Sequence, residues 1–328
     1  MSLEKTCQIF FVFLLTTLVS VCPSQGADKS FTMLGHRITD QSGNEIIVNT
    51  PFKRVVSLYG AHTENLFSLG CTTQIIGVLP RTHYPPKARH LPAFHYREGA
   101  EKFLAARPDL VLIRPMIARG YPRLVEKLRA SGISVISVQP GNIEEMFLYW
   151  RILGLLTGHE EQAEAMVNEF QKTVTDFRAA SETINPKKRV FFESIHSKMK
   201  TFAPDSMAIF ALECAGGINL AKDAVPARKT NIADFGKERI LALGSQIDVY
   251  LAQVGPMNRP TIAAISDEAG FHIIKAIQTG DIHLIDETMV SRPTMRLLEG
   301  ITTIGRILYP DRFIQAQETP KEKTPDGQ

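Results

Sequence analysis

The segment Arg54-Val-Val-Ser-Leu58 begins the part of the chain that decides the fold. This short apolar run predicts a buried strand, and a helix over residues 63–69 follows it and ends at Gly70. The same alternation then repeats. Further strands are expected at residues 74–79, 109–113 and 133–138, with helices at 98–106 and 121–130. Strands separated by helices indicate right-handed βαβ units and a parallel sheet.

A long helical region comes next. Asn142 and Glu145 form a capping box at its start, and Thr157-Gly158 interrupts the helical pattern. A second helix is expected from about residue 160 to about 180, and at 1.5 Å per residue it would span roughly 30 Å, the width of a small lobe. The chain therefore predicts one lobe, a long helix and a second lobe.

Strand–helix alternation restarts after Pro186. Strands are expected at residues 189–193, 247–253 and 281–285, and helices at 207–215, 238–243, 271–278 and 294–308. The predicted organisation is a signal peptide (1–27), an N-terminal lobe (28–141), a linker helix region (142–185), a C-terminal lobe (186–314) and a disordered tail (315–328).

The composition excludes some function classes. Hydrophobic residues make up 44% and charged residues 22% of the 328 residues, as in ordinary soluble proteins. The formal net charge is +3, and no basic stretch interleaves with aromatic residues, so nucleic acid is not an expected partner. Phosphate-binding loops, nucleophile elbows and His-Glu-x-x-His pairs are missing from the sequence, which favours a protein that is not an enzyme.

The N-terminus has the pattern of an export signal. An apolar run from Ile9 to Val21 is too short for a comfortable membrane span, and cleavage is expected near Gly26 or Ala27. A lipid anchor on Cys22, an uncleaved anchor and a cytosolic chain are the alternatives. Cys71 and Cys214 lack metal-site spacing, and we expect two buried free thiols.

Candidate binding residues follow the predicted strands, because open α/β sheets bind ligands beyond the carboxyl ends of their strands. These loops are rich in His, Tyr and Arg, which suit transition metals, ferric iron and anionic chelates. The alternative is that the loop histidines are simply exposed polar residues. The predicted ligand contacts are Tyr59, His62, Arg81, His83, Tyr84, His95, Tyr96, Arg114, Met116, His196, Arg228 and Arg292, and His83, His95 and His196 are the candidate metal ligands.

The two halves carry a weak internal repeat. Glu101-Lys-Phe-Leu-Ala105 precedes Asp109-Leu-Val-Leu112, and Glu238-Arg-Ile-Leu-Ala242 precedes Asp248-Val-Tyr-Leu251. Each half thus has a helix headed by glutamate and followed by a strand. Coincidence is the alternative, because such helix phrases are common.

Phrases in a fixed order over about 270 residues give the chain a family resemblance. It resembles the iron-siderophore/cobalamin family of periplasmic substrate-binding proteins, whose lobes are joined by one long helix. The matching phrases are Ile38-Thr-Asp40 with Gly43, Pro51–Leu58, Thr63-Glu64 with Leu66, Leu69 and Gly70, Ile76-Gly-Val78, Tyr84-Pro85-Pro86, Glu101 with Ala105, Arg107–Val111, Gly216–Asn219, Glu238–Ala242, Ser291–Arg296 and Glu299-Gly300.

The resemblance implies an opening β-hairpin, two Rossmann-like lobes with parallel sheets and a ligand cleft between them. It also implies an extracytoplasmic monomer that captures a metal chelate and delivers it to the permease dimer of an ABC importer. By motif position, Glu101 and Glu238 would dock onto permease arginines; the alternative is two ordinary helix-start glutamates, which the helix dipole favours. No intrinsic cofactor is expected, and the ligand would be an iron or cobalt chelate.

The residues leave the ligand open. His83-Tyr84 and His95-Tyr96 would suit a ferric catecholate, Tyr84 and His95 could equally flank a corrinoid or haem, and Met116 fits either. One rival function is an extracytoplasmic chelatase, which predicts a histidine–carboxylate pair such as His196 with Glu193, or a direct transition-metal binder that uses the cleft histidines. Another is a ligand-sensing partner of a membrane receptor.

Overall fold

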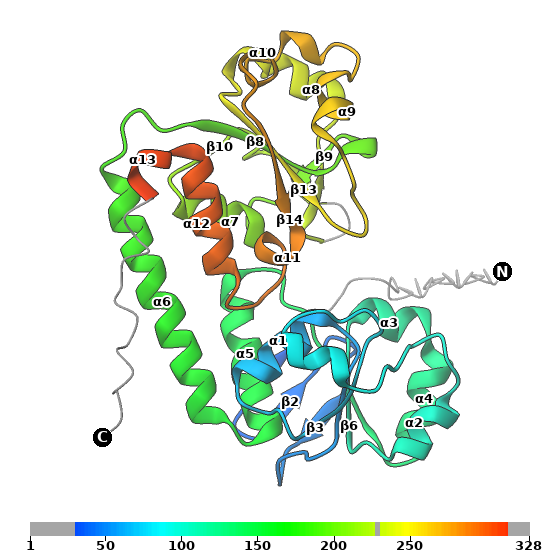
Figure 1. Cartoon of the computed structure of the whole chain (residues 1–328). Coiled ribbons are helices and arrows are strands. Elements are labelled where there is room, and N and C mark those ends of the chain that lie inside the picture. Colours follow the sequence, from blue (N-terminus) through cyan, green and yellow to red (C-terminus); the bar gives the residue numbers. More distant parts are fainter. Residues whose placement is uncertain (1–29, 227–229, 314–328) are drawn as a thin grey trace, which may run out of the picture.

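The computed structural model describes residues 30–226 and 230–313. The predicted signal peptide, its Cys7 and Cys22, the loop residue Arg228 and the tail from residue 315 lie outside these ranges. Within them, two α/β lobes are joined by a pair of helices (Figure 1). We call the first the N-lobe and the second the C-lobe.

The N-lobe contains a four-stranded parallel sheet, as predicted. Its strands are β4 (Val55–Ser57), β5 (Ile75–Val78), β6 (Leu110–Ile113) and β7 (Ser134–Ser137), in the order β5-β4-β6-β7. All strand residues except Ile76 and Ser134 are buried, because helices cover both faces. Those helices are α1 (Gly60–Ser68), α2 (Ala100–Ala106), α3 (Pro115–Gly120), α4 (Pro122–Ala130) and α5 (Ile143–Thr157).

A small antiparallel sheet opens the described chain. It consists of β1 (Thr32–Leu34), β2 (Arg37–Thr39) and β3 (Glu45–Ile47), paired in sequence order. The β2–β3 hairpin confirms the hairpin implied by the family resemblance. Helix α3, the 3₁₀ helix at Pro86–His90 and β1 were not predicted from the sequence.

The predicted interruption separates α5 from α6 (Glu160–Glu182), which runs along one side of both lobes (Figure 1). The Asn142 side chain accepts a hydrogen bond from the Glu145 amide at the start of α5. Gly158 ends α5 with φ +73°, a conformation that glycine adopts without steric cost. At 23 residues α6 is about 34 Å long. Phe170 on α6 packs against Trp150 on α5, at 5.6 Å between ring centroids.

The C-lobe sheet contains the predicted parallel strands, and it also has an antiparallel edge that the sequence did not predict. Strands β8 (Arg189–Ile195), β13 (Val249–Val254), β14 (Ile282–Asp286) and β10 (Ile218–Asn219) are parallel. Strand β9 (Lys200–Phe202) returns antiparallel after only four residues, a length that no parallel crossover allows. Strands β12 (Ile232–Asp234) and β11 (Val225–Pro226) continue the antiparallel edge.

Helices cover both faces of this sheet as well. One face carries α7 (Met207–Cys214), α11 (Glu287–Val290) and α12 (Leu297–Leu308), whose apolar residues join a core that reaches the N-lobe through α5 and α6. The other face carries α8 (Lys237–Ala242), α9 (Ile262–Ser266) and α10 (Lys275–Thr279). The chain continues past α12 into α13 (Pro310–Phe313).

Cys71 and Cys214 are buried free thiols, which confirms that prediction for the described residues. In the same residues, every helix is too short or too polar to cross a membrane.

Candidate functional site

A cavity of about 390 Å³ lies between the lobes, and we call it the arginine cavity. The N-lobe supplies the start of α1 and the loop that follows β5, and the C-lobe supplies the segment that follows β14. Both the β5 loop and the β14 segment extend the carboxyl end of a parallel strand, where open α/β sheets bind ligands. The lining residues are Gly60, Leu79, Pro80, Arg81, Thr82, His83, Tyr84, Arg89, Asp286, Thr288, Arg292 and Arg296.

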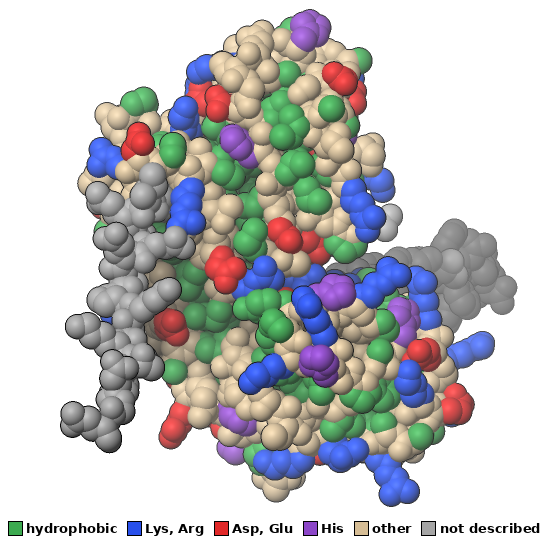
Figure 2. Space-filling view, viewed as in Figure 1, with side chains coloured by type: hydrophobic (Ala, Val, Ile, Leu, Met, Phe, Trp, Pro, Cys, Tyr) green, Lys and Arg blue, Asp and Glu red, His purple; other side chains and the backbone are tan. Residues whose placement is uncertain are grey.

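Charged side chains meet along this boundary between the lobes (Figure 2). Nη1 of Arg292 lies 3.0 Å from Oε1 of Glu64, a buried residue of α1, and Arg292 also approaches Glu287 at 3.5 Å. Arg296 lies 3.8 Å from Oε2 of Glu64, an oxygen that has no hydrogen bond within the described residues. Burial raises the pKa of the Glu64 carboxyl, and the two arginines oppose that shift. A Cβ added at Gly60 would lie 2.6 Å from Nη1 of Arg292, so glycine gives this guanidinium its room.

Backbone contacts fix the same turn of the C-lobe against the N-lobe. The carbonyl oxygen of Pro293 accepts hydrogen bonds from Nδ2 of Asn65 at 2.9 Å and from Nε1 of Trp150 at 3.2 Å. All three groups are buried. Arg292 is therefore presented to the cavity by a turn that is anchored on α1 and α5.

Four of the twelve predicted ligand contacts line the arginine cavity: Arg81, His83, Tyr84 and Arg292. Arg81 has φ +63°, the left-handed region that residues other than glycine rarely adopt. The Tyr84 ring lies under the guanidinium of Arg296, 4.4 Å from its centre, and the residue is 43% exposed. This combination offers an aromatic face and positive charge to a ligand.

Tyr59, Arg114 and Met116 lie at strand ends, as expected, but outside the lining of the arginine cavity. The Arg114 guanidinium stacks on the Tyr59 ring at 4.5 Å, and its Nη2 donates to Sδ of Met116 at 3.5 Å. Nε of Arg114 is buried and has no hydrogen bond within the described residues. Burial raises the pKa of Tyr59.

His62 is not a ligand contact in this structure, which corrects the prediction. It is fully buried on α1, with Nδ1 2.7 Å from the Tyr149 hydroxyl and Nε2 3.2 Å from the carbonyl oxygen of Ile113. Burial lowers the pKa of His62 to about 3, so the ring stays neutral. Both of its nitrogens are occupied within the N-lobe.

His95 and Tyr96 are placed away from the arginine cavity. Their rings lie against each other, with centroids 4.3 Å apart, and Tyr96 packs on Tyr121. Tyr96 and Tyr121 line a separate hollow of about 470 Å³ that belongs to the N-lobe alone and also includes Glu101. The structure therefore does not bring His95 together with His83-Tyr84 at the arginine cavity.

His196 belongs to a polar cluster in the C-lobe. Its Nδ1 donates to Oε2 of Glu193 at 2.8 Å, and the same oxygen accepts a hydrogen bond from the Tyr250 hydroxyl. The hydrogen bond to Glu193 raises the pKa of His196, and Glu268 adds to this effect. Glu193 is fully buried, and its Oε1 has no partner within the described residues.

The proposed set of metal ligands is not assembled. His83 lines the arginine cavity, His95 stacks on Tyr96, and His196 pairs with Glu193 in the C-lobe. Across residues 30–226 and 230–313, no group of three or more His, Cys, Asp and Glu side chains could hold a metal ion.

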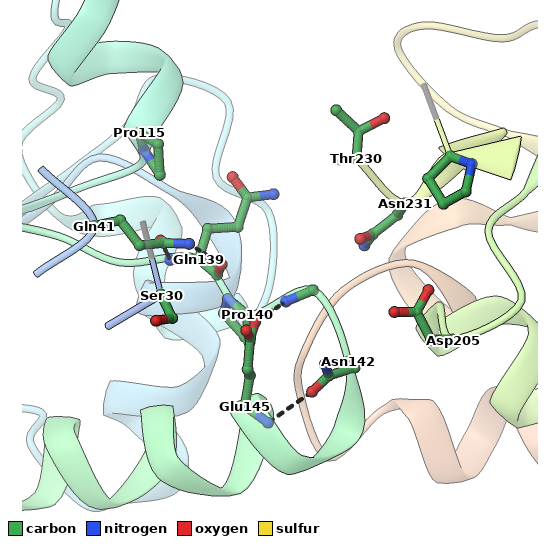
Figure 3. A pocket seen from close by; sticks show the side chains of 12 residues that line it. Ser30, Gln41, Pro115, Gln139, Pro140, Asn142, Glu145, Asp205, Thr230 and Asn231 are labelled. Atoms are coloured by element: carbon green, nitrogen blue, oxygen red, sulfur yellow. Dashed lines mark hydrogen bonds between the residues drawn. The ribbon is translucent and has the colours of Figure 1, made fainter. Parts of the chain in front are cut away.

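A second cavity between the lobes, of about 620 Å³, is lined largely by amides and carboxylates. Figure 3 shows Gln139 and Asn142 on the N-lobe side and Asp205, Thr230 and Asn231 across the space. Much of its polar lining already forms hydrogen bonds within the protein. Gln41 exchanges hydrogen bonds with the Gln139 backbone, and Asn142 and Glu145 cap α5. The remaining lining residues are Ser30, Pro115, Pro140, Gly141 and Pro226.

Glu101 and Glu238 are both exposed and both lie in the first turn of a short helix, α2 and α8 respectively. The Glu101 side chain is 73% exposed and forms an ion pair with Lys127 at 2.6 Å. Each lobe thus presents one such carboxylate at its surface.

Sequence reasoning missed several residues of the arginine cavity and its surroundings, above all Glu64, Arg89 and Arg296. Glu64 and Arg296 stand within the phrases that carry the family resemblance, and Arg89 lies in the same loop as His83. Those phrases marked Glu64 and Arg296 as residues shared with the family. They did not show that the two side chains lie beside one cavity, because Glu64 and Arg292 are 228 residues apart in the sequence.

Comparison with known proteins shows where this architecture recurs. The model of a family described as "Periplasmic binding protein" matches residues 55–289. An uncharacterized ABC transporter substrate-binding lipoprotein of Bacillus subtilis is 24% identical over 281 residues, 84% of this chain and 86% of the relative. A vitamin B12-binding protein of Vibrio cholerae is 24% identical over 257 residues, 77% of this chain and 88% of the relative.

The fold is also found in solved structures. The crystal structure of a possible iron-binding (periplasmic solute-binding) protein of Staphylococcus epidermidis superimposes with a TM-score of 0.69 at 26% identity. The match covers 79% of this chain and 100% of that protein.

Proposed function

Because this chain belongs to the periplasmic binding protein family, we propose that it captures a metal chelate outside the cytoplasmic membrane and delivers it to the permease of an ABC importer. The observation that carries the proposal is the arginine cavity, whose wall is built from both lobes. A ligand in such a site would contact both lobes at once and would be held without a covalent step. The relatives named for vitamin B12 and iron support a corrinoid or an iron chelate, such as a ferric siderophore or haem.

Capture would use the side chains already in place. Tyr84 would cover part of the ligand's face. His83 is the one of the three predicted metal ligands that lines this cavity, and it would contact the metal of a bound chelate. Glu101 and Glu238 would then dock the loaded monomer onto the permease dimer, since paired rim charges mainly improve orientation and association rate.

A second candidate rests on one specific observation. The pair of His196 with Glu193, which a chelatase would need as acid and base, is formed at 2.8 Å. Both residues lie outside the lining of the two interlobe cavities, and Tyr250 already occupies the same carboxylate oxygen. The chelatase alternative requires metal consumption with turnover, whereas a binding protein releases its chelate unchanged.

A thermal-shift panel on the purified protein tests the proposal. It contains ferric siderophores, cobalamin, cobinamide, haem and free Ni²⁺, Zn²⁺ and Co²⁺. A ligand at 100 times its Kd should add about 2.7 kcal/mol to the free energy of unfolding. At about 2–4 °C per kcal/mol for a domain of 150–250 residues, the melting temperature should rise by several degrees. A response to free metal ions and to no chelate would contradict the proposal and support the chelatase or direct metal binder.

A further inference from the structure

The arginine cavity has an unusual excess of positive charge for a small site. Four arginines line it, Arg81 and Arg89 from the N-lobe and Arg292 and Arg296 from the C-lobe. Asp286 is the one carboxylate among the described residues of the lining. Positive charge that lines a cleft between two lobes of low dielectric concentrates the electric field and attracts anions.

The two arginines of the C-lobe already have acidic partners. Arg292 pairs with Glu64 and Glu287, and Arg296 approaches Glu64 at 3.8 Å and Glu299 at 3.5 Å. These carboxylates hold both guanidinium groups in place in the wall of the cavity. Their charge is therefore largely balanced before any ligand binds.

The two arginines of the N-lobe are different. Neither Arg81 nor Arg89 has a carboxylate within 4.0 Å among the described residues. The single hydrogen bond of the Arg89 side chain runs from Nε to the carbonyl oxygen of His83, at 3.1 Å. Its two Nη groups remain open to a ligand. The planar guanidinium group of arginine suits carboxylates and other flat anionic groups, which it binds through two parallel hydrogen bonds.

The backbone at Arg81 supports a functional role. A long side chain at φ +63° is disfavoured, and such conformations persist where the surrounding structure holds them, often at ligand clamps. Here Thr82 holds the turn, because its amide and its hydroxyl both donate to the carbonyl oxygen of Leu79. The loop thus presents Arg81 to the same cavity as Arg89.

We propose that the chelate bound here carries net negative charge, and that Arg81 and Arg89 are the residues that select for it. This inference rests on the proposed function and names the ligand class of the same site. Acidic groups of the chelate would lie toward the N-lobe loop, and its flat part would lie on the Tyr84 ring. Arg292 and Arg296 would stay with their acidic partners, and Arg296 would support that ring.

The test compares anionic with neutral chelates on the full chain. Haem and a ferric tris-catecholate are the anionic probes, and cyanocobalamin and a neutral ferric trihydroxamate are the neutral ones. Dissociation constants are measured by isothermal titration calorimetry at low and high NaCl for the wild type, Arg81→Gln, Arg89→Gln and the double variant. Arg123→Gln is the matched control, because Arg123 is exposed in the same lobe but lines the separate N-lobe hollow.

We expect one anionic probe to bind, more weakly at high salt. Each single substitution should weaken it about 3- to 10-fold and the double variant about 10- to 100-fold, with unchanged circular dichroism and melting temperature. Arg123→Gln should leave the affinity unaltered. Tight binding of a neutral chelate alone, or an anionic chelate bound equally well by the double variant, would overturn this inference and leave the importer function standing. Failure of all four chelates to bind would instead count against the proposed function itself.

Discussion

Nη1 of Arg292 lies 3.0 Å from Oε1 of Glu64, and this ion pair joins the C-lobe to the N-lobe beside the arginine cavity. Glu64 is only 3% exposed, so a charged carboxylate is stable there because the arginines neutralise it. The pair thus links the stability of the lobe arrangement to the site.

Removing the arginine from this pair should destabilise the protein. Arg292→Ala would leave the buried Glu64 charge with Arg296 alone, at 3.8 Å, and we expect a loss of about 3 kcal/mol in the free energy of unfolding. Arg37→Ala is the matched control, because the Arg37–Glu45 pair is exposed and should contribute less than about 1 kcal/mol. Urea denaturation measures both. Equal, small losses in the two variants would show that the interlobe pair is dispensable.

His62 should make the protein sensitive to acid. Its pKa is about 3 in the folded chain and near 6.5 when unfolded, so between these values the unfolded state binds a proton that the folded state does not. Stability should therefore fall as pH falls, by up to about 1.4 kcal/mol per pH unit from this group. His62→Gln should show a smaller decrease between pH 6.5 and 4 in urea denaturation.

The exposed His90 offers a control for that experiment, because His90→Gln also removes a histidine but leaves the buried core unchanged. If His62→Gln and the wild type lose stability in parallel on acidification, the buried neutral state of His62 is contradicted.

His196 should act in the opposite direction. The hydrogen bond to Glu193 raises the pKa of His196 in the folded protein. The resulting stabilisation is fully present below the unfolded pKa near 6.5 and is lost as pH rises through the folded pKa. His196→Gln should therefore be less stable than the wild type at pH 6, and the difference should shrink by pH 9. Thermal unfolding at both pH values tests this, and a constant difference would refute it.

The two surface glutamates should matter for delivery and not for capture. The double variant Glu101→Gln, Glu238→Gln is expressed in cells that lack the wild-type binding protein. It should reduce uptake of the chelate about tenfold or more, and its Kd for the chelate should be unchanged. Glu161→Gln is the control, because Glu161 is also exposed in the first turn of a helix, α6. Normal uptake by the double variant would assign the two glutamates to ordinary helix-start roles.

Much of the fold was predictable because its signals are local. The buried runs at β4 and β6, the cap at Asn142 and the break at Gly158 each depend on a few neighbouring residues, and all were found at the expected places. The mixed C-lobe sheet was not predictable in this way. Strand β9 pairs with β8 across a turn of four residues whose sequence carries no clear hairpin pattern.

The candidate site was predictable only in part. The rule that ligands lie beyond strand ends selected Arg81, His83, Tyr84 and Arg292, which line one cavity between the lobes. The same rule selected His62, which instead faces Tyr149 in the N-lobe core. A strand-end position fixes where a backbone lies but not the direction of the side chain, since that direction depends on how the following helix packs.

The sequence by itself therefore determined the order of strands and helices, the long helical connection between the two lobes and the family. The first two follow from hydrophobic periodicity and helix caps, and the family follows from short sequence phrases that occur in a fixed order. Only the tertiary structure decided which polar side chains meet. Glu64 reads as an ordinary helix residue until the fold brings Arg292 and Arg296 to it from the far end of the chain. The buried carboxylate of Glu64 and these arginines form an ion pair between the lobes, and burial also keeps His62 neutral.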